Sequence, residues 1–112
     1  MPSKDPEKRA AHNRAYYERN KQDRLRRNEE VRRRNFAYTR EIKNITPCTD
    51  CGVQYPHYVM DFDHLGDKTN NISTMCNQLV SLETLQKEIN KCELVCANCH
   101  RIRTFTRNAL VA

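Results

Sequence analysis

The first 45 residues contain few apolar side chains, and their spacing forms no continuous apolar stripe. No Gly or Pro interrupts the chain between Pro6 and Ile45, and good helix formers dominate it. Asp5 before Pro6 suits a helix start, because Asp caps a helix and Pro is tolerated at its first position. Pro47 then stops the run. The pattern predicts one long helix over about 6–45, exposed to solvent.

The next 35 or so residues predict a strand and then a loop. Residues 58–63 (YVMDFD) are rich in aromatic and β-branched side chains, and their second half alternates between apolar and polar. This composition and period are typical of a short strand. Residues 65–80 (LGDKTNNISTMCNQLV) carry many turn formers, so we expect them to form a loop.

Two helices and a second strand are predicted in the last third of the chain. Ser81 can cap a helix whose Leu82, Leu85 and Ile89 form one apolar stripe, and residues 92–95 (CELV) are typical of a short strand. A final helix from Cys99 would place three apolar side chains inward and four polar ones outward. The inward residues are Ile102, Phe105 and Ala109, and the outward ones are His100, Arg103, Thr104 and Arg107.

These elements indicate an α+β fold, mostly helical, with a helical arm over 1–45 and a folded domain over 46–112. Only 38% of the 112 residues are apolar and Trp is absent, so the core of the domain must be small. Small cores are commonly reinforced by a metal or by disulfides.

The positive charge belongs to the arm. Residues 1–45 carry 14 Lys/Arg and 7 Asp/Glu, a net of +7, and residues 46–112 carry 6 and 7, a net of −1. Arginine clusters suit phosphate binding, so DNA or another nucleic acid is the expected partner, although a solvated charged helix would also fit. The clustered arginines are Arg24, Arg26, Arg27, Arg32, Arg33 and Arg34.

Neither a signal peptide nor a membrane span is expected. The N-terminal MPSKDPEKRA has no apolar core, and no segment approaches the roughly 20 apolar residues of a span. We therefore expect no membrane partner and a cytoplasmic location, where reducing conditions favour metal binding by paired cysteines over disulfides.

Four of the six cysteines form two C-x-x-C pairs with 44 residues between them. Two such pairs suit a tetrahedral structural zinc site made by Cys48, Cys51, Cys96 and Cys99. The sequence C-x-x-C-H at 96–100 also matches c-type haem attachment, but that normally follows export from the cytoplasm. Cys76 and Cys92 fit neither pair and are expected to be buried free thiols.

His100 follows the last zinc ligand and is surplus to it. Its neighbours Arg101, Arg103 and Arg107 make that face suitable for a phosphate and a second metal ion. Residues 61–64 (DFDH) add carboxylates and an imidazole just before a glycine turn. Strand alternation places Asp61 and Asp63 on one face and His64 on the other, which makes Asp61 a rival to Asp63 as metal ligand.

The order C-x-x-C, DFDH-x-x-G, helix, KCELVCANCHRIRT resembles the HNH endonucleases, the ββα-metal nuclease fold, over about 46–106. It closely resembles the small phage-type members, which have a zinc-knuckle pair and a basic N-terminal helix. The resemblance implies metal-dependent DNA cleavage that leaves a 5′-phosphate and a 3′-hydroxyl. It implies that Asp63 and His100 are the ligands of one catalytic ion and that His64 is the general base. It also suggests a role in phage packaging or homing, in the host cytoplasm.

Several alternatives stay open. Asn90 is either the middle residue of the HNH motif or a left-handed helix cap after 82–89. A carboxylate and imidazole site accepts Mg²⁺, Mn²⁺, Ni²⁺ or Co²⁺. The competing functions are a non-catalytic zinc module that binds nucleic acid and a zinc-stapled interaction adaptor. A monomer with one site would nick DNA and a dimer could cut both strands, and the sequence does not distinguish these.

Overall fold

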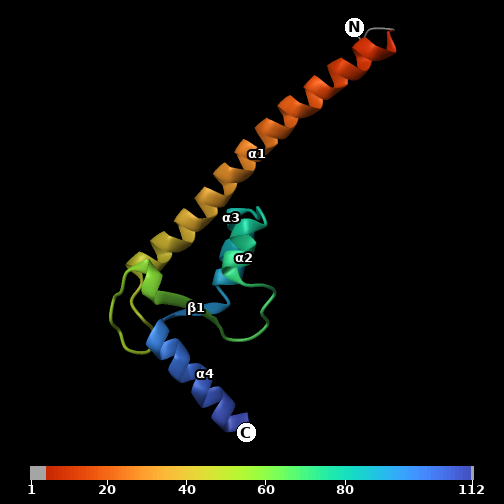
Figure 1. The fold of residues 1–112 in the computed structure, drawn as a ribbon. Coiled ribbons are helices and arrows are strands. Elements are labelled where there is room, and N and C mark those ends of the chain that lie inside the picture. The colour runs from red at the N-terminus through yellow and green to blue at the C-terminus, as the bar shows by residue number, and fades with distance from the viewer. Residues whose placement is uncertain (1–4, 112) are drawn as a thin grey trace. The chain divides into compact units, whose positions relative to one another are not determined.

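The computed structural model describes residues 5–111 (Figure 1). The chain is mostly helical with one small antiparallel sheet, which confirms the predicted α+β class at this level. None of its helices in this range is long and apolar enough to cross a membrane. The elements in order are α1 (Pro6–Ile45), a 3-10 turn (His57–Val59), β1 (Met60–His64), α2 (Ile72–Asn77), α3 (Leu82–Ile89), β2 (Cys92–Cys96) and α4 (Ala97–Val111).

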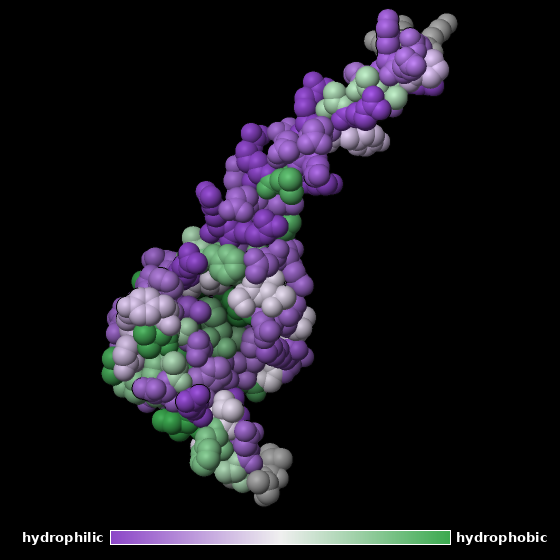
Figure 2. Space-filling view, viewed as in Figure 1, coloured by the Kyte–Doolittle hydropathy of each residue, from purple (hydrophilic) through white to green (hydrophobic). Residues whose placement is uncertain are grey.

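Helix α1 begins and ends as its sequence predicts. The Asp5 carboxylate accepts the backbone N–H of Glu7 at 3.0 Å, and Pro6 is the first helical residue. Every residue from Asp5 to Arg27 is exposed, and Figure 2 shows a mostly hydrophilic surface on this part of the helix. The sparse apolar residues in this half therefore contribute to no core.

The chain divides into two compact units, and the division lies inside α1. One unit ends at Val31 and the other begins at Arg32, whereas the sequence suggested a boundary after residue 45. The difference arises because the last turns of α1 belong to the folded core. Asn35 is fully buried, and its amide donates to the carbonyl oxygens of Val80 at 3.1 Å and Cys76 at 3.4 Å.

Two apolar clusters make up the core of the second unit. The first surrounds the strands and the second lies between α2 and α3; Ile42 of α1 and Phe62 of β1 pack against both. The buried members are Cys48, Met60, Leu94, Val95 and Cys96 in the first cluster, and Ile72, Met75, Cys76, Leu85 and Ile89 in the second.

The two strands form an antiparallel pair in which Asp61 lies opposite Val95 and Asp63 opposite Glu93. The first strand starts two residues later than predicted, because residues 57–59 form a 3-10 turn after Pro56. Helix α4 follows β2 directly, and because β2 pairs with β1, α4 also lies beside β1.

The predicted loop over 65–80 was partly wrong, because it contains helix α2. Ile72, Met75 and Cys76 are buried at the i, i+3, i+4 spacing of one helix face. Many turn formers around them concealed this short pattern. Helix α3 is as predicted: the Ser81 hydroxyl caps it by accepting the N–H of Thr84 at 3.1 Å.

The predicted orientation of the final helix was wrong. Ile102 and Phe105 are 62% and 74% exposed, and Ala109 is exposed as well. The side chain of Arg103, expected to point outward, is only 17% exposed. The reason is the sheet: β1 presents carboxylates to α4, so the helix turns its histidine and arginine face toward them.

Candidate functional site

The four cysteines of the two C-x-x-C pairs come together in space. The four Sγ atoms all lie within 4.8 Å of one another, and they belong to Cys48, Cys51, Cys96 and Cys99. Within residues 5–111 this is the only such group of three or more metal-ligating residues. Cys48 and Cys96 are buried, whereas Cys51 is exposed. The cluster could hold a metal ion such as zinc, as predicted.

Backbone N–H groups point at these sulfurs and prepare them for a cation. Cys96 N–H donates to Cys48 Sγ at 3.2 Å, and Cys99 N–H donates to Cys96 Sγ at 3.4 Å. Burial raises the pKa of the Cys48 thiol, but N–H donors from Cys51, Cys96 and Asp50 outweigh it and lower that pKa to about 6. Hydrogen bonding with Cys96, together with burial, raises the pKa of Cys99 to about 12. Thiolates this close together repel one another, and a bound cation removes that repulsion; four sulfur donors suit zinc.

The other two cysteines lie outside this cluster. Cys76 is fully buried in the core, and burial raises the pKa of its thiol. Cys92 is half-buried, and burial raises its pKa to about 11. Both are free thiols, as expected, although Cys92 is less buried than the prediction implied.

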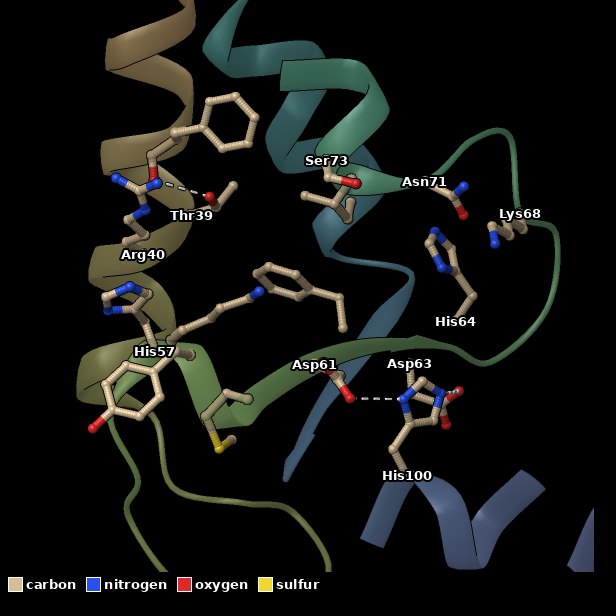
Figure 3. Close-up of a pocket in the computed structure, with 16 residues that line it drawn as sticks. Thr39, Arg40, His57, Asp61, Asp63, His64, Lys68, Asn71, Ser73 and His100 are labelled. Carbon is tan, nitrogen blue, oxygen red and sulfur yellow. Dashed lines mark hydrogen bonds and ion pairs between the residues drawn. The ribbon is translucent and has the colours of Figure 1, made fainter. Parts of the chain in front are cut away.

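His100 lies between two carboxylates of β1 (Figure 3). Its Nδ1 is 3.1 Å from Asp61 Oδ2, and its Nε2 is 3.5 Å from Asp63 Oδ1. Asp61 and Asp63 share a strand face, as alternation predicts, and the first turn of α4 places the imidazole between them. The structure therefore brings together residues almost 40 positions apart in sequence.

The separations distinguish the two carboxylates. At 3.1 Å, Asp61 accepts a hydrogen bond from His100 Nδ1, which leaves Nε2 as the nitrogen facing Asp63. Two ligand atoms, each about 2.1 Å from one ion, lie roughly 3–3.5 Å apart. The Nε2 to Asp63 distance suits such a pair, and Asp61 suits the role of an acceptor that orients the imidazole.

Two arginines of α4 also hold Asp63. Arg103 donates to Asp63 Oδ2 at 2.8 Å, and Arg107 donates to Oδ1 at 3.0 Å and Oδ2 at 2.7 Å. The Arg107 guanidinium is the main cause that lowers the pKa of Asp63 to about 2. Arg103 also binds Asp50 through two nitrogens, both at 2.6 Å. Arg103 is thus engaged by carboxylates, while Arg107 is half exposed and better placed to reach a phosphate.

His64 points away from this carboxylate face, toward α3. Its Nε2 is buried, lies 3.7 Å from Glu88 Oε1, and makes no hydrogen bond with any described residue. The Glu88 side chain is 2% exposed; it accepts the N–H of Thr69 at 2.9 Å and pairs with Lys91 Nζ at 3.1 Å. Sequence patterns did not indicate Glu88, because its spacing placed it simply among the polar residues of a helix.

Asn90 occupies the cap position after α3 in a right-handed conformation (φ −63°, ψ −18°). Its side-chain oxygen accepts a hydrogen bond from Gln86 at 2.7 Å. The left-handed cap, one of the two alternatives for Asn90, is therefore not adopted. The side chain is exposed, and it is not among the residues that line the groove around His64 and His100.

The predicted phosphate-binding arginines lie in different environments. Arg24, Arg26 and Arg27 are exposed on α1, and Arg26 pairs with exposed Asp23 at 3.0 Å. Arg34 donates to the carbonyl of Val80, so it also supports the core. Arg32 and Arg33 have partners of their own, and Arg101 is exposed on α4.

Comparison with protein-family models, with curated proteins and with solved structures finds no significant match. Any functional proposal therefore rests on the residues of this chain and on its motif resemblance.

Proposed function

We propose that the protein is a metal-dependent DNA endonuclease with the ββα-metal fold of the HNH nucleases. The observation that carries this proposal is the position of His100 between Asp61 and Asp63, with His64 next along the strand. An imidazole from one helix and carboxylates from a facing strand are donors that suit Mg²⁺, Mn²⁺, Ni²⁺ or Co²⁺.

Asp63 and His100 Nε2 would hold the catalytic ion, and Asp61 would orient the imidazole through Nδ1. A divalent ion in this place supplies charge stabilisation to the scissile phosphate and its leaving 3′-oxygen. Arg107 must then release one Asp63 oxygen, and its half-exposed side chain is free to turn toward the phosphate. His64 acts as the general base that takes a proton from the attacking water.

Zinc on the four cysteines has a structural role in this proposal. It joins the loop before β1 to the end of β2 and the start of α4, and so fixes where the His100 helix begins. The exposed arginines of α1 bind DNA phosphates through charge alone. Reduced, metal-bound cysteines fit a cytoplasmic location, which is the host cytoplasm for a phage-encoded nuclease.

One observation favours the alternative, a zinc module that binds nucleic acid without cutting it. Both Asp63 oxygens accept hydrogen bonds from arginines, and such a cluster can serve stability alone. In that case cleavage would be absent at any metal concentration, while DNA binding would remain.

Nicking of supercoiled plasmid across a panel of divalent metals tests the proposal. We expect cleavage with at least one metal, and we expect His64→Ala to lower the rate by at least about 100-fold. His12→Ala is the matched control, because His12 is exposed on α1 far from the site in sequence. If His64→Ala cuts as fast as wild type, the assignment of His64 as the general base is wrong. In the same assay, the ratio of nicked to linear product reports whether one or both DNA strands are cut.

A further inference from the structure

A groove of about 650 Å³ lies along β1 within the second compact unit, and residues from both faces of the strand line it (Figure 3). The floor of the groove includes Asp61, Asp63, His64 and His100. One wall is the end of α1, and the other is the segment from Lys68 to the start of α2. The proposed catalytic residues thus occupy only the floor of a larger site.

Three cations line the walls of this groove: Arg40 and Lys43 from α1, and Lys68 opposite them. No ion pair is found for any of the three within residues 5–111. Aromatic rings hold two of them in place, since Arg40 Cζ lies 5.7 Å from the ring centroid of Phe36 and Lys43 Nζ lies 5.1 Å from that of Phe62. Lys43 is half-buried, and a cation removed from water in this way favours an anionic ligand.

An exposed aromatic side chain stands at the same groove. Tyr58 lines it and is 78% exposed, and its ring meets the His57 ring edge-on with centroids 5.6 Å apart. A single exposed tyrosine has no special meaning by itself. Together with the three cations, however, it forms a combination that proteins use to bind unpaired nucleotides. In such sites the basic groups bind phosphates and a base stacks on the aromatic ring.

We propose that this groove binds a single strand of nucleic acid, with phosphates on Arg40, Lys43 and Lys68 and an unpaired base against Tyr58. The inference rests on the proposed nuclease function for the choice of DNA and for the position of the scissile phosphate on the groove floor. The volume is in the range of sites that bind one small ligand, such as a nucleotide unit of a strand. Bases paired in a duplex offer no free face to Tyr58. The preferred substrate is therefore DNA with unpaired nucleotides at the cleavage point.

Binding measurements test this independently of cleavage. The probes are a fluorescein-labelled 12-nucleotide oligo-dT and a blunt DNA hairpin of equal phosphate number, read by anisotropy in EDTA-free buffer without added divalent metal. The exposed part of α1 contributes charge to both probes, so each groove variant is measured on both, and a loss confined to the single strand is assigned to the groove. We expect the single strand to bind at least ten-fold more tightly.

Four variants assign the effect to residues. Tyr58→Ala should weaken single-strand binding at least five-fold and leave the hairpin unchanged, and Tyr58→Phe should restore it because stacking needs only the ring. Lys43→Ala should weaken single-strand binding at least three-fold. Lys87→Ala is the matched control and should change neither probe, because Lys87 is exposed on α3 and pairs with Glu83. Circular dichroism and zinc content confirm that each variant is folded.

Two results overturn the inference: equal affinity for both probes, or a Tyr58→Ala variant that binds the single strand like wild type. These differ from failure of the proposed function. A protein that prefers the single strand but cuts no DNA with any metal contradicts the nuclease and keeps the groove. A protein that cuts plasmid but shows no single-strand preference keeps the nuclease and contradicts the groove.

Discussion

At the scale of single residues, neighbours that are far away in sequence set the chemistry of the site. Asp61 and Asp63 differ by two positions, yet Asp61 pairs with His100 while Asp63 pairs with His100, Arg103 and Arg107. His64, one position further, faces buried Glu88. Strand alternation predicts the face of the strand on which each side chain lies, but not the residues that it contacts there.

Glu88 is predicted to position His64. Glu88 Oε1 lies 3.7 Å from His64 Nε2, and a buried carboxylate at this distance stabilises one orientation of the ring through its charge. Glu88→Gln keeps an acceptor for Thr69 N–H but loses the charge, so we expect the turnover rate to fall by about 10- to 100-fold with little change in KM. Plasmid nicking at several substrate concentrations measures this.

Glu83→Gln is the matched control for Glu88, because Glu83 lies on the same helix with an 82% exposed side chain. It should cut at the wild-type rate. A Glu88→Gln variant with normal turnover and a normal melting temperature would remove Glu88 from the mechanism.

At the scale of elements, helix α4 shows how a facing surface can override an apolar pattern. Ile102, Phe105 and Ala109 have helical spacing, and spacing alone predicts that they face the core. The adjacent strand offers carboxylates instead, and two arginines and a histidine on the other face satisfy them. Leaving a buried carboxylate such as Asp63 without a partner would cost more than exposing these three apolar side chains.

This orientation predicts an unusual pattern of stability. Phe105→Ser should change the free energy of unfolding by less than about 0.5 kcal/mol, because the ring is already exposed. Arg103→Ala should cost roughly 2 kcal/mol, because Asp63 loses one of its donors in a buried position. Urea denaturation measures both variants. A larger loss for Phe105→Ser than for Arg103→Ala would mean that the helix packs through its apolar face.

At the scale of the whole molecule, the two compact units are expected to have different roles. The second unit has a small core in two clusters, and its four-cysteine group ties the loop before β1 to the end of β2. The first unit is an exposed helix with basic side chains. Stability is therefore expected to depend on metal in one unit, and binding strength on charge in the other.

Metal removal should unfold the second unit. We expect one zinc per chain by atomic absorption, and a chelator should abolish the cooperative thermal transition, because a core of this size depends on the cross-link. Cys51→Ser should do the same because it removes one proposed metal ligand. Cys51 is exposed, so the substitution removes almost no packing, and any loss of stability reports the metal. Cys92→Ala, outside the cluster, is the control and should keep its zinc. An unchanged melting curve in chelator would contradict a structural metal.

Charge on the first unit should set the salt dependence of DNA binding. Replacing Arg24, Arg26 and Arg27 together by Gln removes three exposed cations without touching the core. The slope of log affinity against log salt should then become shallower by about 1 for each DNA phosphate that the variant no longer neutralises. Fluorescence anisotropy of a labelled duplex between low and moderate salt measures the slope. An unchanged slope would mean that this helix does not bind DNA.

The sequence by itself determined the features that depend on local spacing. The start and end of α1, the cap of α3, the two C-x-x-C pairs and the concentration of charge before residue 46 all follow from neighbouring residues, and the structure agrees with the elements. Only the tertiary structure decided which face of α4 packs inward, that Glu88 stands behind His64, and that the turns of α1 from Arg32 onward belong to the core. The physical reason is that a charged side chain is buried only where a distant partner compensates it, and spacing along a chain does not name that partner.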